Sequence, residues 1–542
     1  MKIAGMTTIF ASVALFAAVA LATDAAALPW ALVARSGQEA PGLWVPANFT
    51  EFTLASKLGP GGRVVFGIPA PGSLPPGQAG VYGWTSAGGL SLLAAYSTTP
   101  DAEFASATRV VQGDDGDVAL LAELRPKPMP LCGQGIPLVG PPVLYGRVGT
   151  ALARVAFWND PAPGAPDGWV FHDFSDAILG ASHSIFYAGT SPDACSEGAD
   201  PTLFRFDEAG TTTLVVRHGM EAPGAAAGTT IDQVLPGAAI ADDGTVAVLA
   251  SLSTLTAFTP HAIYGFDADA VLAPLVMTGS PTVMAGGASF EALGAPVSNG
   301  AGDLAFYAIL DDALIDFPDP SLRGLWVPDG AGGVVELFRA GDAVPGAPAG
   351  AVFADLRPFI PSILDPEGLR INASGEVAFV EWIEVAPELY ERGIFGPDGS
   401  GAITLRMRTG EPAPSIAGAT VSSLALLGFG DDRRIAVAAD LAGPTVDASN
   451  DRALYLLDPS GVATLLHRNG DLFEYGTSQK RPTYLRVASF DRALSHVAVE
   501  LASNDGREAV FISPLPEPSE SMLAATVWVS LLTRWFLQKR SS

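Results

Sequence analysis

Short apolar runs that follow a turn recur along the chain and predict β-strands. The clearest is Val377-Ala378-Phe379, which follows the turn Asn372-Ala373-Ser374-Gly375-Glu376. An Asn or Asp side chain folds back onto the backbone and Gly supplies positive φ, so such a turn leads the chain directly into a strand. Other copies begin at Asp114, Asp242 and Ser298, and degenerate ones begin near Gly62, Ser182, Arg433 and Ser495.

The spacing of these turns predicts a repeat protein. The first and last starts, at 62 and 495, enclose seven intervals of about 62 residues each. A second strand such as Gly324-Leu325-Trp326-Val327 follows in most units and ends in a hairpin turn. A third strand reads apolar-apolar-x-Arg-x-Gly or close to it, and its arginine is Arg35, Arg217, Arg339, Arg408 or Arg468.

The two ends of the repeat region are complementary. The segment from Ala31 to Pro41 has the pattern of a third strand without a first or second strand before it, whereas the last unit stops after its second strand near Ile512. An open solenoid would need polar caps at both ends, but here the N-terminal segment can complete the last sheet. We therefore predict an all-β protein, a β-propeller of about eight blades closed by an N-terminal strand, over residues 28–513. Seven blades, an open β-solenoid and a row of β-sandwiches are the alternatives.

The termini predict export. Residues 1–27 combine Lys2, the apolar run from Ile9 to Leu21 and a small-residue stretch that ends at Ala27, which is the pattern of a signal peptide. Residues 514–542 hold Pro516-Glu517-Pro518, an apolar stretch from Met522 to Leu537 and the basic end Lys539-Arg540, which predicts a short transmembrane helix. An uncleaved N-terminal anchor and a C-terminal amphipathic helix on the domain surface are the alternatives.

Two resemblances sharpen this interpretation. The repeat resembles the choice-of-anchor tandem-repeat family that is named for its Asn-x-x-Gly-x-x-Ala-Phe motif, which Asn372 and Gly375 represent here. The C-terminal Pro-Glu-Pro segment resembles the PEP-CTERM sorting signals of Gram-negative bacteria. The resemblances imply a cell-surface or extracellular protein with no assigned chemistry. They also imply an exosortase-type processing enzyme as partner and at least transient anchoring through the tail.

The charge composition argues against nucleic acid as a partner. The chain has 57 Asp plus Glu against 30 Lys plus Arg, and no basic stripe. A negative surface repels phosphates rather than releasing counterions from them. Charged residues are only 16% of the chain, below the ~25% that is usual in globular domains.

Three features are candidates for special chemistry, and each has a structural alternative. Cys132 and Cys195 are the only cysteines and lie in consecutive units, so we expect a disulfide in an exported protein, with two free thiols as the alternative. The repeat arginines are interpreted as braces within each blade, with an anion-binding ring as the alternative. We expect no cofactor; the alternative is Ca²⁺ at the Asp-rich turns 114–117 and 242–244, which ordinary hairpins also explain.

No catalytic motif is present. The histidines are scattered, and neither a Gly-x-Ser-x-Gly elbow nor a His-Glu-x-x-His helix occurs; they are His172, His183, His218, His261, His467 and His496. Our first hypothesis is a non-catalytic surface or matrix protein that binds an extracellular polysaccharide or an envelope protein, with Trp44, Trp84 and Trp158 as candidate stacking platforms. The competing hypotheses are a polysaccharide-active hydrolase or lyase that uses the axial funnel, and a purely structural spacer.

Overall fold

A computed structural model describes most of residues 29–515. Outside the description lie 1–28, 42–47, 50–51, 56, 69–79, 96–103, 114–116, 125–140, 149–150, 182, 193–198, 254–259, 268, 270, 280–288, 312–322, 330–333, 355–367, 476–477, 482–483, 504–506 and 516–542. The predicted signal peptide and sorting tail are among these. In the described part, no helix has the length and apolar character needed to cross a membrane.

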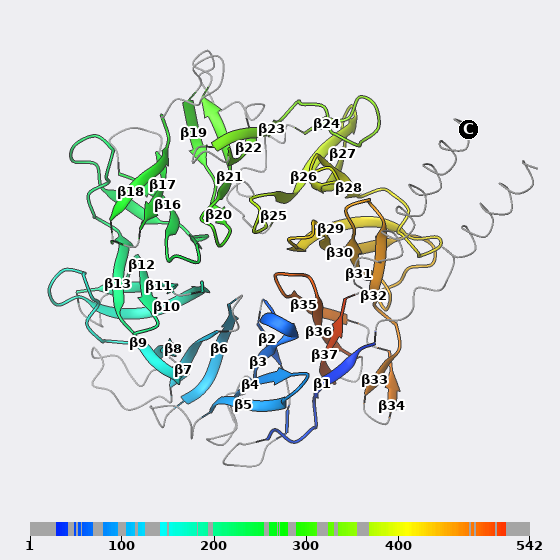
Figure 1. The fold of residues 1–542 in the computed structure, drawn as a ribbon, viewed down its shortest axis with the longest axis horizontal. Helices are drawn as coiled ribbons and strands as arrows, with labels where there is room; N and C mark the ends of the chain where they lie inside the picture. The colour runs from blue at the N-terminus through cyan, green and yellow to red at the C-terminus, as the bar shows by residue number, and fades with distance from the viewer. Residues whose placement is uncertain are drawn as a thin grey trace, which may run out of the picture.

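Eight antiparallel sheets of four or five strands follow one another along the chain and form a ring (Figure 1). We number them blades 1 to 8 in chain order, with the blade that contains both chain ends as blade 8. In blades 1 to 7 the first strand in sequence lies nearest the centre of the ring and later strands lie progressively further out. The predicted eight-bladed β-propeller is confirmed, and the seven-bladed, solenoid and sandwich alternatives are excluded.

The first four blades hold the following strands. Blade 1 has β2 (Thr53–Leu54), the 3-10 turn η1 (Pro60–Gly62), β3 (Val64–Ile68), β4 (Gly80–Thr85) and β5 (Gly89–Ala95). Blade 2 has β6 (Phe104–Gln112), β7 (Val118–Leu124), β8 (Pro142–Val148) and β9 (Ala151–Phe157). Blade 3 has β10 (Val170–Leu179), β11 (His183–Ser191), β12 (Asp200–Asp207) and β13 (Thr212–Arg217). Blade 4 has β14 (Ile231–Val234), β15 (Ala239–Ile240), β16 (Val246–Leu252), β17 (His261–Phe266) and β18 (Leu272–Met277).

The remaining blades continue the series. Blade 5 has β19 (Ser289–Leu293), β20 (Val297–Ser298), β21 (Leu304–Asp311), β22 (Arg323–Pro328) and β23 (Val334–Arg339). Blade 6 has β24 (Val352–Phe353), β25 (Leu369–Ile371), β26 (Val377–Ala386), β27 (Leu389–Pro397) and β28 (Ile403–Arg408). Blade 7 has β29 (Thr420–Phe429), β30 (Ile435–Ala442), β31 (Arg452–Leu457) and β32 (Ala463–Arg468), and is followed by the hairpin β33 (Phe473–Tyr475) and β34 (Ser478–Lys480). Blade 8 has β35 (Tyr484–Phe490), β36 (His496–Ala502), β37 (Glu508–Pro514) and β1 (Ala31–Arg35).

The repeat turn joins the innermost strand to the second strand. In blade 6, for example, the turn 372–376 lies between β25 and β26. The strand that the sequence pattern placed first in each unit is therefore the second strand of its blade. The innermost strand was missed because in blades 4, 5 and 6 it is broken into two short pieces that pair with the same neighbour.

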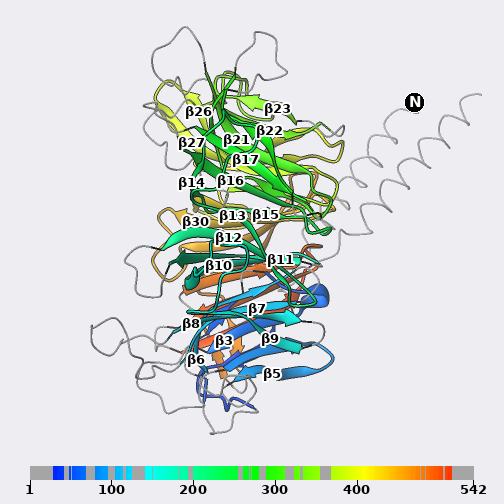
Figure 2. The same ribbon diagram turned by 90° about the vertical axis from the view of Figure 1, so that its left-hand side faces the viewer.

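The hydrophobic core is divided among the interfaces between neighbouring blades, whose sheets pack face to face (Figure 2). Between blades 5 and 6, the rings of Phe338 and Phe379 stack with centroids 5.0 Å apart. Each strand alternates its side chains between two such interfaces, so both faces of a blade are apolar. The third strand of a blade, counted from the axis, contributes large buried aromatic side chains to these interfaces. They are Tyr82 on β4, Tyr145 on β8, Tyr264 on β17, Trp326 on β22 and Tyr455 on β31.

The ring is closed by the N-terminal strand, as predicted. β1 is the outermost strand of blade 8 and pairs antiparallel with β37, with Ala31 opposite Ile512 and Arg35 opposite Ala509. The backbone N–H of Ser36 continues the ladder by donating to Glu508 O at 2.8 Å. Strands from opposite ends of the sequence thus share one sheet, which removes an exposed strand edge.

A hairpin-like arm leads from the outer strand of several blades to the inner strand of the next. In the arm after blade 5, Gly341 N–H donates to Phe353 O and Val344 N–H donates to Ala351 O. Pro345 of this arm accepts a hydrogen bond from Leu405 N–H on the outer strand of blade 6, at 2.9 Å. The arm therefore covers part of the next blade's outer edge and ties consecutive blades together.

Candidate functional site

The turns between inner and second strands form a ring around the axis, and we call them the axial turns. In five of them the first residue's carbonyl accepts from the N–H three residues on, at 2.9 to 3.1 Å: Ala241 to Gly244, Asn299 to Gly302, Asn372 to Gly375, Gly430 to Arg433 and Asp491 to Leu494. The fourth residue has positive φ in each, including Arg433 (66°) and Leu494 (47°), which are not glycine. The repeat geometry thus persists where the glycine signature is lost.

The repeat asparagine shapes its own turn and joins the next blade. Asn372 is 2% exposed, and its Oδ1 accepts from the N–H groups of Ser374 and Glu376 at 3.0 and 2.9 Å. Its Nδ2 donates across the blade boundary to Gly430 O at 3.5 Å. Asn299 repeats the arrangement one blade earlier by donating to Asn372 O at 2.9 Å. These amides therefore link blades 5, 6 and 7 in series.

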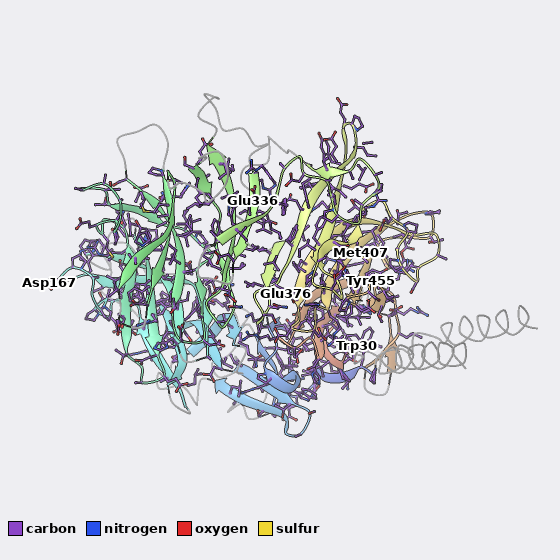
Figure 3. The ribbon with its side chains drawn as sticks, turned by 45° about the horizontal axis from the view of Figure 1, so that its top comes forward. Trp30, Asp167, Glu336, Glu376, Met407 and Tyr455 are labelled. Atoms are coloured by element: carbon purple, nitrogen blue, oxygen red, sulfur yellow. The ribbon has the colours of Figure 1, made fainter. Side chains whose placement is uncertain are left out.

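Charged side chains continue this linkage. Glu376, near the middle of the ring in Figure 3, pairs with Arg433 of blade 7 at 2.7 Å. Arg434 Nη2 donates to Leu494 O of blade 8 at 2.9 Å. The geometry around the axis is thus held by side chains as well as by backbone.

One ion pair crosses the axis. Arg492 Nη1 of blade 8 lies 3.9 Å from Asp242 Oδ2 of blade 4. Blades 4 and 8 are opposite each other in a ring of eight. The axial turns therefore converge closely enough for side chains to meet across the centre at this end of the channel.

The Asp-rich turns that the sequence marked as candidate Ca²⁺ sites are only partly described. At 242–244, Asp243 Oδ1 accepts from Thr245 N–H at 2.9 Å, which is an ordinary turn contact. Residues 114–116 lie outside the described residues. Among the residues with a described position, no group of three or more His, Cys, Asp or Glu side chains is arranged to hold a metal ion.

A second polar group lies on the inner strands of blades 2 and 3. Arg109 Nη2 on β6 lies 3.1 Å from Asp176 Oδ1 on β10. Burial raises the pKa of the Asp176 carboxyl, and Arg109 partly opposes this shift. On the same strand, Asp173 Oδ1 accepts from Gly189 N–H at 3.0 Å and Oδ2 lies 3.5 Å from His172 Nδ1. The Arg109–Asp176 pair could not be found from the sequence, because its two residues come together only where blades 2 and 3 meet.

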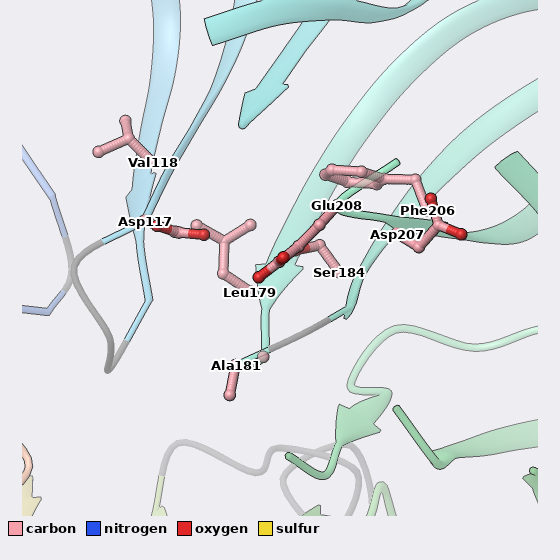
Figure 4. A pocket seen from close by; sticks show the side chains of 9 residues that line it. Asp117, Val118, Leu179, Ala181, Ser184, Phe206, Asp207 and Glu208 are labelled. Atoms are coloured by element: carbon pink, nitrogen blue, oxygen red, sulfur yellow. The ribbon is translucent and has the colours of Figure 1, made fainter. Parts of the chain in front are cut away.

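A small hollow lies near these strands, between the axial-turn ends of blades 2 and 3 (Figure 4). Asp117 and Val118 line one side, and Ser184, Asp207 and Glu208 are among the residues on the other. Its free volume of about 10 Å³ is room for about one water molecule. The hollow is far smaller than the ~300 Å³ at which small-molecule sites begin.

The repeat arginines lie at the ends of outer strands and contact their own or an adjacent blade. Arg339 pairs with Glu336 at 2.7 Å, and Arg408 pairs with Glu411 at 2.9 Å and with Glu391. Arg217 donates to His218 O at 2.6 Å and lies over the Trp169 ring, and Arg468 donates to Asn450 O at 2.9 Å. Arg35 is the last residue of β1. They are spread around the ring's circumference, and their role as braces stays a prediction.

Several predicted site residues cannot be placed. Cys132, Cys195, Trp44 and the Pro516-Glu517-Pro518 box lie outside the described residues. Trp84 and Trp158 are half-buried, on β4 and directly after β9. The disulfide and the sorting signal therefore stay predictions.

Taken together, the ring of blades and its axial turns define an eight-bladed β-propeller that is closed by its own N-terminal strand. The chain belongs to a family of unknown function, DUF7453, whose model matches residues 13–287 and 281–522. No curated protein was found to match the sequence.

Similar solved structures include two lyases and an arabinanase. An oligogalacturonate lyase in complex with manganese is 13% identical, with 91% of this chain and 99% of that chain covered, at a TM-score of 0.39. The oligogalacturonate lyase of Vibrio parahaemolyticus is 11% identical, with 91% of this chain and 98% of that chain covered, at a TM-score of 0.38. The α-L-arabinanase of Penicillium chrysogenum complexed with arabinobiose is 12% identical, with 75% of this chain and 92% of that chain covered, at a TM-score of 0.26. Sequence identities and TM-scores this low assign no function to this chain.

Proposed function

We propose that this chain is an exported cell-surface or extracellular-matrix protein whose ring is a binding scaffold without a catalytic role. The observation that carries the proposal is the use of the axial polar groups. Asn299 and Asn372 bond across blade boundaries, and Arg492 and Asp242 pair across the axis. Groups that hold the ring together in this way are not available to a substrate at that end of the channel.

Partner binding is assigned to the opposite face of the ring. Because the strands of a blade alternate in direction, the loops between second and third strands and the interblade arms emerge on the face away from the axial turns. The described hairpin β26–β27 presents Leu389 and Tyr390 there, 53% and 40% exposed. Exposed apolar and aromatic side chains on a rigid hairpin suit an extracellular polysaccharide or an envelope protein.

Export and anchoring are proposed from the terminal sequences. β1 begins at Ala31, and its register partner Ile512 lies near the end of β37. A leader that ends at residue 27 and a tail that begins at 514 would join the same end of blade 8, where Ala31 lies opposite Ile512. The proposed sorting tail, with Pro516-Glu517-Pro518 as its start, would therefore hold the ring by its closing blade and present that tail to an exosortase-type enzyme.

The experiment compares binding with turnover. The full chain is incubated with a panel of extracellular polysaccharides, and retention on each polymer is measured beside the release of reducing or unsaturated ends. We expect retention on at least one polymer without release of products. Retention on none of them, and on no isolated envelope fraction, would overturn the binding role.

The same experiment tests the enzyme alternative. A hydrolase or lyase needs an axial acid, and Asp176 is an inner-strand carboxyl whose pKa is raised by burial. If products are released by the wild type and by Asp440→Asn, a control at a half-exposed carboxyl near the end of β30 in blade 7, but not by Asp176→Asn, the ring is an enzyme and the scaffold proposal fails.

A further inference from the structure

The outer strand of blade 7 carries a buried histidine where other blades carry apolar residues. His467 directly precedes the repeat arginine of its strand and is 1% exposed. The residues in the same position of other outer strands are Ala34, Val216, Phe338 and Met407. His467 is therefore a polar substitution in an otherwise apolar repeat position.

This histidine lies against the segment that closes the ring. The Trp30 ring, one residue before β1, meets the His467 ring edge-on with centroids 6.4 Å apart. Phe473 of β33 meets the same ring at 4.9 Å, and also packs on Phe511 of β37 at 4.7 Å. We call His467, Phe473 and Phe511 the aromatic socket of Trp30. Trp30 itself is labelled in Figure 3, where it lies beside the C-terminal blades.

The socket offers little stabilisation to a charged imidazole. Neither ring nitrogen of His467 has a hydrogen-bond partner among the described residues. The nearest carboxylate, Asp471 Oδ2, lies 3.6 Å from Nδ1, and burial raises the pKa of Asp471. Among the side chains that the structure describes, the other charged residues on the elements packed here are Arg35 of β1, Arg452 of β31, Arg468 of β32, Arg481 after β34 and Glu508 of β37. Burial is the cause that disfavours the charged imidazole.

We propose that the aromatic socket is an acid-sensitive lock on the closing strand. A neutral His467 packs beside Trp30 and holds the start of β1 in blade 8. Protonation of His467 places a charge in an apolar socket where its ion-pair contact is the half-exposed Asp471 and neither ring nitrogen is hydrogen-bonded. A buried charge held so weakly is costly, so the protonated ring is driven out toward water. Trp30 then loses one of its two ring contacts and keeps only Phe473, at 5.4 Å, so the pairing of β1 with β37 weakens. The lock is independent of what the ring binds and is not part of the proposed function.

The pH range follows from the two protonation equilibria. Burial lowers the pKa of His467 from 6.5 to about 3. An opened strand exposes His467, which then takes up a proton below about pH 6.5, whereas the closed form does so only near pH 3. Closure is therefore fully stable above about pH 6.5 and weakens by up to about tenfold for each pH unit below it.

The experiment measures hydrogen exchange at the backbone amides of Ala31 to Arg35 in the full chain, at pH 7.5 and 4.5, corrected for the intrinsic pH dependence of exchange. We expect opening of β1 to increase by about ten- to a hundredfold at the lower pH. Amides of β26, which lies in blade 6 and shares no core cluster with the socket, should change much less. An unchanged opening of β1, or an equal change in the exchange of β26, would overturn the lock.

Matched variants separate His467 from other acid-sensitive groups. His467→Phe supplies the side chain of Phe338, and His467→Met supplies that of Met407 should the first variant fail to fold. Either variant should keep β1 closed at pH 4.5. Trp30→Ala should open β1 at both pH values without an additional acid response. An acid response that persists in the His467 variants belongs to another group, such as Asp471, and contradicts the proposal.

Discussion

Two neighbouring blade interfaces reach the same geometry with different chemistry. Between blades 5 and 6, Arg323 donates to both carboxylate oxygens of Glu381 at 3.1 and 2.9 Å, and the Tyr307 hydroxyl donates to Val380 O. At the interface between blades 6 and 7, Arg392 of blade 6 is equivalent to Arg323 of blade 5. The residue of blade 7 that is equivalent to Glu381 is Ala439, which has no carboxylate. The Arg392 guanidinium lies over the Trp382 ring instead, at 5.6 Å.

The axial turns at these interfaces differ in the same way. Blade 6 enters its turn with Asn372 and places Gly375 at the position of positive φ, whereas blade 7 has Gly430 and Arg433 at those positions. The missing amide and glycine in blade 7 are offset by the ion pair between Arg433 and Glu376. Backbone geometry and apolar packing are thus retained at both interfaces, whereas the polar links differ between them.

The largest expected effect comes from the buried ion pair. Glu381 is 3% exposed, so Glu381→Ala leaves the guanidinium of Arg323 buried without its carboxylate. We expect the free energy of unfolding to fall by about 3 to 5 kcal/mol. Denaturant unfolding should show this loss, whereas Glu391→Ala should cost less, because its ion pair with Arg408 is less deeply buried. A loss no larger than that of Glu391→Ala would mean that burial of the Arg323–Glu381 pair does not set this interface apart.

Removing the repeat asparagine should have an intermediate effect. Asn372→Ala leaves the N–H groups of Ser374 and Glu376 and the carbonyl of Gly430 without their amide partner. We expect a loss of about 2 to 3 kcal/mol in the free energy of unfolding. Asn372→Asp keeps the acceptor for both N–H groups but replaces the donor to Glu376 Oε2, at 3.1 Å, with a second carboxylate, so its loss should be at least as large. A clearly smaller loss for Asn372→Asp would show that the turn matters more than the contacts of the amide nitrogen.

The smallest effect concerns the fourth residue of the turn. Gly375 has φ +77°, and a Cβ there would lie 2.9 Å from Asp303 Oδ2, so Gly375→Ala should cost about 1 to 2 kcal/mol. Arg433→Gly relieves positive φ in blade 7 but loses the ion pair with Glu376, so the two effects should largely cancel. Thermal unfolding of both variants measures the change in stability. A larger loss of stability for Arg433→Gly than for Gly375→Ala would show that the ion pair, and not backbone geometry, dominates the turn of blade 7.

The sequence was sufficient for much of the fold, because second and third strands carry continuous apolar runs between turn residues. It also predicted the closing strand, since Ala31 to Arg35 matched an outer strand with no blade of its own. The inner strands were missed because their side chains alternate and their pairing is irregular. β10, for example, has two register shifts against β11 and exposes Asp173.

The candidate sites were less predictable. The pairs Arg109–Asp176 and Arg492–Asp242 join different blades, and their sequence separation gives no sign of contact. His467 offered a signal that was not used, since aligning the outer strands shows a histidine in a column of apolar residues. Arg433 and Leu494 adopt positive φ without glycine, so the turn motif could not fix the local register there.

The central claim is that the N-terminal strand closes blade 8 in a defined register. The most direct measurement is disulfide formation between Ala31→Cys and Ile512→Cys, which are opposite each other in the structure, in a chain whose Cys132 and Cys195 are replaced by serine. Peptide mass mapping without reduction should find this link within one chain, while the off-register pair Ala31→Cys with Ala509→Cys should remain reduced. Linking of the off-register pair alone, or of neither pair, would contradict closure of the ring by β1.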